Sequence, residues 1–206
     1  MPNSLPPGAP TPDDALERLR EGNQRFVSGH GTVINRWHPG LTEGQAPFAV
    51  VFGCSDSRAP AEYVFDQGLG DLFVIRVAGN IVAPSLTGSV EFAAGKFGTR
   101  LVVVMGHTQC GAVSATVTAL EFGGPPESRN MLSIVDRIAP QVKHLLDQPY
   151  DHETRLIHAV RANALASARE LRSSSPVLRG LVERGQVRIV AAVYDLATGI
   201  VDFFDP

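Results

Sequence analysis

The stretch PFAVVFGCSDSR, residues 47–58, passes from an apolar segment straight into a thiol, a carboxylate and a guanidinium. Its first part, FAVVFG (48–53), has the length of a strand and no polar position, which is typical of a strand buried on both faces of a parallel sheet. Three further runs of this kind follow along the chain: DLFVIRVAG (71–79), RLVVVMGH (100–107) and QVRIVAAVYDL (186–196). TGIVDFF (198–204) follows the fourth run after a Thr-Gly turn, so we expect it to pair back as an antiparallel edge strand.

Helical patterns fill the spaces between these runs. They lie around 60–67, 87–97, 111–121, 130–147 and 153–172. Alternating strands and helices indicate an α/β fold: a mainly parallel sheet of about four strands plus an antiparallel edge strand, flanked by helices. We see no internal repeat and no linker, so residues 1–206 are predicted to form a single domain.

The beginning of the chain predicts a separate helical arm. Residues 1–10 are rich in Pro and Gly and are expected to form a flexible tail. Residues 11–29 follow as an N-terminal helix, since Thr11 and Asp14 have the spacing of a capping box and Pro12 stands at the first helical position. Gly29 can end this helix.

Composition and charge exclude several classes of function. The net charge is −3 with no basic stripe, which argues against a nucleic-acid surface. No run of 18 apolar residues exists, so no membrane span is expected, and the first residues lack the basic start and apolar core of a signal peptide. Two cysteines do not make a disulfide framework. These features favour a cytoplasmic protein with free thiols.

Both cysteines and one histidine are placed next to predicted strand ends. Cys54 directly follows the first strand, His107 ends the third, and Cys110 comes three residues later. Because open parallel sheets place their sites at the carboxyl ends of strands, these side chains converge if the two strands are neighbours. Two thiolates and an imidazole are a set of zinc ligands, and three protein ligands leave a fourth position open, as in catalytic sites.

Asp56 and Arg58 follow Cys54 at alternate positions. Such residues can face each other across a short turn and form a carboxylate–guanidinium pair. Asp56 has a further option, because a carboxylate two residues from a metal thiolate can bind the metal itself. The simpler interpretations are a loop salt bridge for this pair, and inert burial or a redox disulfide for Cys54 and Cys110.

Two motifs carry a resemblance to a known family. CSDSR (54–58), followed by GHTQCG (106–111), resembles the β-class carbonic anhydrases. The similarity continues through FDQG (65–68), GDLFVIR (70–76) and AGN (78–80), and it covers most of the chain. The resemblance implies a zinc lyase, a carbonate dehydratase that interconverts CO2 and bicarbonate. It also implies a homodimer or homotetramer, with the N-terminal helix packed on the partner subunit.

The resemblance also assigns roles to individual residues. Cys54, His107 and Cys110 would hold one Zn2+ per chain, and a zinc-bound hydroxide would be oriented by the dyad of Asp56 and Arg58. Gln67 resembles a glutamine that reaches into the active site from the dimer interface. The backbone N–H of Gly111 is expected to contact bound bicarbonate. Cys54, Asp56, His107 and Cys110 are therefore the expected metal-binding residues.

Two other functions fit the same ligands. One is a zinc lyase or hydrolase of the same fold that acts on carbonyl sulfide or carbon disulfide. The other is a zinc-binding or bicarbonate-sensing protein without catalytic activity. The Asp56–Arg58 pair argues against the second, because a purely structural zinc needs no open position.

Overall fold

The computed structural model describes residues 9–32, 37, 39–124 and 128–206, and five strands within these ranges form one sheet. The strands follow the order β2–β1–β3–β4–β5 across the sheet. The first four run parallel, and β5 pairs antiparallel with β4 at the edge, which confirms the predicted fold class. The bounds are β1 (Ala49–Gly53), β2 (Leu72–Arg76), β3 (Leu101–His107), β4 (Arg188–Tyr194) and β5 (Val201–Phe204).

The helices fall between the strands as the alternation predicted. Their bounds are α1 (Pro12–Val27), α2 (Ala61–Val64), α3 (Pro84–Phe97), α4 (Gly111–Phe122), α5 (Arg129–Val142), α6 (His152–Ser174) and α7 (Pro176–Glu183), with short 3-10 helices η1 (Pro39–Glu43), η2 (Ala78–Asn80) and η3 (Lys143–Asp147). Three details differ from the sequence-based expectation. The second strand ends at Arg76, the helix expected at 130–147 divides into α5 and η3, and α7 was not predicted.

Helix α1 begins with the predicted capping box. The hydroxyl of Thr11 accepts a hydrogen bond from the backbone N–H of Asp14, and the Asp14 carboxylate accepts one from the backbone N–H of Thr11, both at 3.1 Å. Two of the otherwise unpaired N–H groups at the helix start are therefore satisfied. Residues 1–8 of the expected tail lie outside the described residues.

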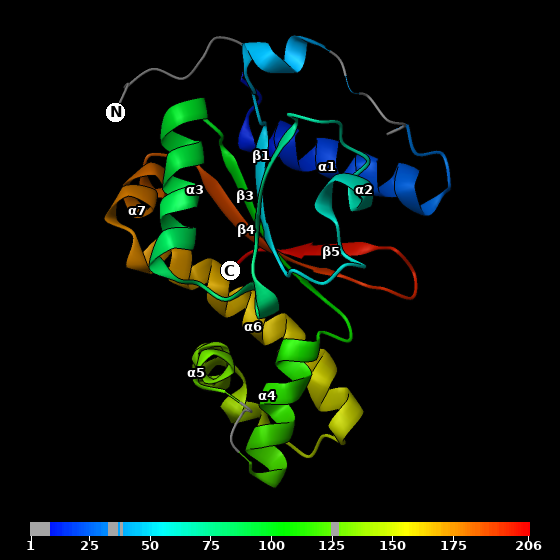
Figure 1. Cartoon of the computed structure of the whole chain (residues 1–206), viewed down its shortest axis with the longest axis vertical. Helices are drawn as coiled ribbons and strands as arrows, with labels where there is room; N and C mark the ends of the chain where they lie inside the picture. Colours follow the sequence, from blue (N-terminus) through cyan, green and yellow to red (C-terminus); the bar gives the residue numbers. More distant parts are fainter. Residues whose placement is uncertain (1–8, 33–36, 38, 125–127) are drawn as a thin grey trace.

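Helices cover both faces of the sheet because β1 buries side chains in both directions. Ala49 and Val51 pack on the face covered by α1 and α2, whereas Val50 and Phe52 pack on the face covered by α3, α6 and α7. Figure 1 shows the sheet between these two groups of helices. This double burial explains why the strands read as continuous apolar runs.

A third apolar cluster lies beyond the carboxyl ends of the strands. Helices α4 and α5 pack there against the first part of α6, below the sheet in Figure 1. Cys54 and Cys110 belong to this cluster together with Ile138 of α5. The predicted site therefore lies where the sheet meets a layer of helices. Every helix in the described part of the chain is too short or too polar to cross a lipid bilayer.

Candidate metal centre

The parallel pairing of β1 and β3 brings the three predicted ligands together. Gly53 at the end of β1 stands opposite Met105, so Cys54 emerges beside the last two residues of β3, Gly106 and His107. Beyond His107 the chain turns through Gln109, whose φ of 57° is left-handed. The turn places Cys110 at the N-cap of α4, facing back toward Cys54.

The ligand atoms have the spacing of a metal site. The sulfurs of Cys54 and Cys110 and the ring nitrogens of His107 offer one atom each, all within 4.8 Å of one another. The two sulfurs lie 3.9 Å apart. Around a tetrahedral Zn2+ with Zn–S bonds of about 2.3 Å, two sulfurs would lie about 3.8 Å apart. The donor set and its spacing therefore fit zinc.

His107 is prepared to bind through one nitrogen. Its Nδ1 lies 2.9 Å from the carbonyl oxygen of Thr108, and because a carbonyl only accepts, Nδ1 carries the proton. Its Nε2 is buried and has no hydrogen-bond partner among the described residues. A buried polar atom without a partner is rare and calls for an explanation, and a bound ion supplies one. The Nδ1 contact is also the kind of support that orients metal-binding histidines.

The surroundings of the two sulfurs favour a thiolate at Cys54 rather than at Cys110. The backbone N–H of Gly79 donates to Sγ of Cys54 over 3.3 Å. Hydrogen bonding from Cys110 lowers the pKa of Cys54 against the opposing effect of burial, and His107 and Gly79 act in the same direction. The same contact and burial raise the pKa of Cys110. Burial opposes a charged His107, but the nearby Cys54 sulfur raises the pKa of the imidazole overall.

Asp56 and Arg58 form the predicted pair beside the ligands. The guanidinium donates from Nε to Oδ1 (2.9 Å) and from Nη2 to Oδ2 (2.8 Å), and the backbone N–H of Arg58 donates to Oδ1 (3.0 Å). These side-chain hydrogen bonds hold the pKa of Asp56 well below its usual range. Oδ2 of Asp56 lies 3.8 Å from Nε2 of His107, so an ionised carboxylate faces the unpartnered ring nitrogen.

Arg76, the last residue of the similar stretch GDLFVIR (70–76), is a further residue of the site. From the end of β2 it donates through Nε to the carbonyl of Cys54 (2.9 Å) and through Nη2 to the carbonyl of Asp56. These contacts fix the backbone of the loop that carries the ligand and the dyad. In the sequence, Arg76 is a lone charge at the carboxyl end of an apolar strand, and the site lies at the same edge of the sheet.

The other two predicted residues lie in different surroundings. Gly111 begins α4 next to Cys110, and a side chain built on it would meet nothing within 4 Å, so its backbone is open to a ligand. Gln67 is buried against α1, where it donates to the carbonyl of Phe65 (2.7 Å) and accepts from Arg18 (3.1 Å). Within one chain the structure therefore brings Gly111, but not Gln67, to the ligands.

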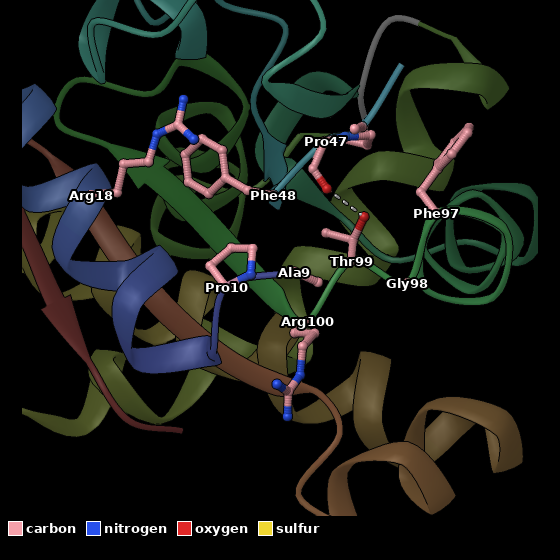
Figure 2. A pocket seen from close by; sticks show the side chains of 10 residues that line it. Ala9, Pro10, Arg18, Pro47, Phe48, Phe97, Gly98, Thr99 and Arg100 are labelled. Carbon is pink, nitrogen blue, oxygen red and sulfur yellow. Dashed lines mark hydrogen bonds between the residues drawn. The ribbon is translucent and has the colours of Figure 1, made fainter. Parts of the chain in front are cut away.

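Two of the pockets formed by the described residues show where a small molecule could approach. One, of about 650 Å³, lies between α4 and α5 and is lined by Gly111 and Ala78 beside mostly apolar residues. The other, of about 230 Å³, lies at the opposite ends of the strands, near Phe48 and Thr99 (Figure 2). Its lining residues include no Cys, His, Asp or Glu, so the second pocket offers neither metal ligands nor an acid or base.

The chain is similar to known carbonic anhydrases in sequence and in fold. A family model described as carbonic anhydrase matches residues 49–201. Carbonic anhydrase 2 of Mycobacterium tuberculosis is 38% identical over 97% of this chain and 93% of its own, and a carbonic anhydrase of Mycolicibacterium smegmatis is 39% identical over 98% and 95%. Among solved structures, the β-carbonic anhydrase CcaA has a TM-score of 0.71 at 26% identity and covers 93% of this chain and 92% of its own. Tetrameric β-carbonic anhydrases from Sordaria macrospora share the fold, with a TM-score of 0.72 at 22% identity over 92% and 96%.

Proposed function

The chain belongs to the β-class carbonic anhydrase family, and we propose that it interconverts CO2 and bicarbonate at one Zn2+ held by Cys54, His107 and Cys110. Membership of this family identifies the chain as a carbonate dehydratase. The observation that carries the assignment to these residues is the unpartnered Nε2 of His107. It lies beside two buried thiols, with an Arg-bound carboxylate 3.8 Å away.

Bound zinc would supply a Lewis acid that makes water available as a nucleophile at neutral pH. The protein's own groups would then orient the reactants. Asp56, held ionised by Arg58, can only accept hydrogen bonds. It would accept the remaining proton of the attacking oxygen, so that a lone pair of this oxygen faces CO2. Arg58 would keep the carboxylate in this orientation and off the metal.

The start of α4 would bind the product. The N-terminus of a helix carries partial positive charge, and its first N–H groups have no partner within the helix. The N-cap residue, Cys110, makes no capping hydrogen bond through its side chain, and the space beside Gly111 is open among the described residues. Bicarbonate could therefore accept a hydrogen bond from the N–H of Gly111. Gln67 is engaged by Arg18 and the carbonyl of Phe65 within this chain, so its predicted role would require a second subunit.

We propose that the enzyme works as a homodimer or homotetramer in the cytoplasm. The tetrameric β-carbonic anhydrases from Sordaria macrospora support a homo-oligomer. The two free cysteines support a cytoplasmic location, because thiols 3.9 Å apart stay reduced more readily in a reducing compartment. Light scattering coupled to size-exclusion chromatography would give the number of subunits.

Stopped-flow CO2 hydration with metal analysis of the same sample tests the function. We expect one zinc per chain and rapid hydration, whereas Asp56→Ala should retain the zinc and lose most of the activity. Full activity in this variant would refute the role of the dyad. Assays with carbonyl sulfide and carbon disulfide should run in parallel, because faster turnover of either would identify a different lyase or hydrolase.

A further inference from the structure

The turn that follows β2 packs directly on the sulfur of Cys54. This turn is η2, Ala78–Asn80, and the N–H of Gly79 donates to Sγ of Cys54 over 3.3 Å. A hydrogen bond to a thiolate spreads its negative charge and fixes the direction of its lone pairs. The strength of the sulfur as a ligand therefore depends on where the Gly79 N–H points.

The conformation of this turn is unusual. Gly79 has a φ of 73° and Asn80 a φ of 43°, both left-handed. A Cβ on Gly79 would lie 2.7 Å from Cδ1 of Ile138 and 3.1 Å from the Cβ of Ala112. Helices α4 and α5 thus close one side of the turn, and only glycine fits there. Glycine adopts a left-handed φ at little cost, so contacts with the surroundings determine the direction of this turn.

A buried side chain of α6 makes hydrogen bonds to the turn. Asn163 is 1% exposed, and its Nδ2 donates to the carbonyl of Gly79 over 2.8 Å. The same Nδ2 lies 3.4 Å from Oδ1 of Asn80, a weaker contact. The Nδ2 of Asn80 is itself buried without a partner among the described residues, so Asn80 adds little support of its own. Asn163 therefore supplies the strongest side-chain contact to the turn.

We propose that Asn163 is a positioning residue of the metal centre, which directs the Gly79 N–H at the Cys54 sulfur by holding the Gly79 carbonyl. This inference rests on the proposed function, because it takes Cys54 to be a metal ligand. Asn163 belongs to the helix layer behind the ligands and acts only through η2. Supporting groups of this kind typically change metal affinity by about 10- to 100-fold when they are replaced.

A matched pair of variants separates this role from general stability. Asn163→Leu keeps a similar volume and removes the donor to Gly79. Asn23→Leu is the control, because Asn23 is also buried and donates to two backbone carbonyls, Val64 (3.1 Å) and Gly199 (2.9 Å). Asn23 is part of α1 and contacts the β4–β5 turn, away from the ligands. Both variants should lower the melting temperature to a similar extent.

Only Asn163→Leu should change the metal centre. We expect it to release zinc to a chromogenic chelator about 10 to 100 times faster than wild type. In cobalt-substituted protein its thiolate-to-cobalt absorption should move to longer wavelength, because a sulfur without the N–H contact gives up its electrons more easily. The control should match wild type in both measurements. Equal zinc release and equal spectra in the two variants would overturn the proposal.

A measurement on the wild-type protein covers the case in which Asn163→Leu does not fold. In 113Cd-substituted protein, the amide proton of Gly79 should show scalar coupling to the metal through the Cys54 sulfur. Absence of this coupling would refute the proposed N–H contact. If wild-type protein binds no metal, the proposed function fails, whereas metal binding with no difference between the two variants removes only the role of Asn163.

Discussion

Removing the guanidinium of Arg58 tests the arrangement on which the proposed chemistry depends. Arg58→Ala deletes two charge-assisted hydrogen bonds to Asp56, of 2.9 and 2.8 Å, and a longer one to the carbonyl of Gln109. The backbone N–H of residue 58 still reaches Oδ1. Asp56 therefore keeps one of its three contacts with Arg58 and gains freedom to rotate.

The size of the effect follows from exposure. Hydrogen bonds to charged groups contribute about 1.5 to 3 kcal/mol when they are buried, whereas exposed ion pairs contribute about 0.2 to 1 kcal/mol. The side chain of Arg58 is 50% exposed and that of Asp56 is 18% exposed, so this pair lies between the two cases. We expect a loss of about 1 to 2 kcal/mol in positioning the carboxylate, which lowers kcat/KM about 5- to 30-fold.

The assay is stopped-flow CO2 hydration with zinc analysis of each sample. Arg161→Ala is the control, because Arg161 is also 50% exposed and pairs with Asp202 over 2.7 Å at a distance from the ligands. The control should retain wild-type kcat/KM, and both variants should retain their zinc. Activity of Arg58→Ala within twofold of the control would refute the reasoning, as would loss of its zinc, because Arg58 would then support the ligands rather than the carboxylate.

Four further substitutions test other parts of the structure. Cys110→Ser should remove zinc and CO2 hydration together, since a hydroxyl replaces a thiolate ligand; an active, zinc-loaded variant would exclude Cys110 as a ligand. Gly79→Ala combines a left-handed φ with the approach to Ile138, so we expect a loss of about 2 to 4 kcal/mol, seen as a melting temperature lower by roughly 5 to 15 °C. Gly22→Ala places a Cβ 1.9 Å from the carbonyl oxygen of Phe65 and should destabilise the docking of α1 by about 1 to 3 kcal/mol in denaturant unfolding. Gly88→Ala, in a helix with open space around it, should instead be neutral or stabilising by up to about 1 kcal/mol.

Much of the fold could be predicted because the strands are buried on both faces. An apolar run such as 100–107 is unambiguous when both sides of a strand pack on helices, and β5 was recognised from its Thr-Gly turn. The second run was predicted too long because Val77, Ala78 and Gly79 carry no polar side chain and so extend the run past the end of β2 at Arg76. Helix α7 was missed although Ser175 caps it and Pro176 begins it, since only 8 residues leave little periodicity to detect.

Of the metal site, the ligands could be predicted from the sequence, but the residues that support them could not. Cys54, His107 and Cys110 could be placed together because strand pairing alone brings the ends of β1 and β3 side by side. The contact of Asn163 with Gly79 joins residues 84 positions apart, on a helix and a turn with no shared motif. Such support depends on how α6 packs across the sheet, which no local pattern encodes. The ligands are therefore visible in the sequence, whereas the groups that hold them emerge only from tertiary packing.

The two arginines of the site hold different parts of Asp56: Arg76 contacts its backbone, and Arg58 contacts its side chain. Arg76 binds the carbonyls of Cys54 and Asp56, so it fixes the backbone of the loop, whereas Arg58 binds only the Asp56 side chain and the Gln109 carbonyl. A carboxylate whose Oδ2 already lies 3.8 Å from the Nε2 of His107 needs only a side-chain rotation to reach a metal bound there. We therefore expect the crystal structure of zinc-loaded Arg58→Ala to show Asp56 on the metal with the loop unmoved. A displaced loop around an uncoordinated Asp56 would mean that Arg58, rather than Arg76, sets the backbone.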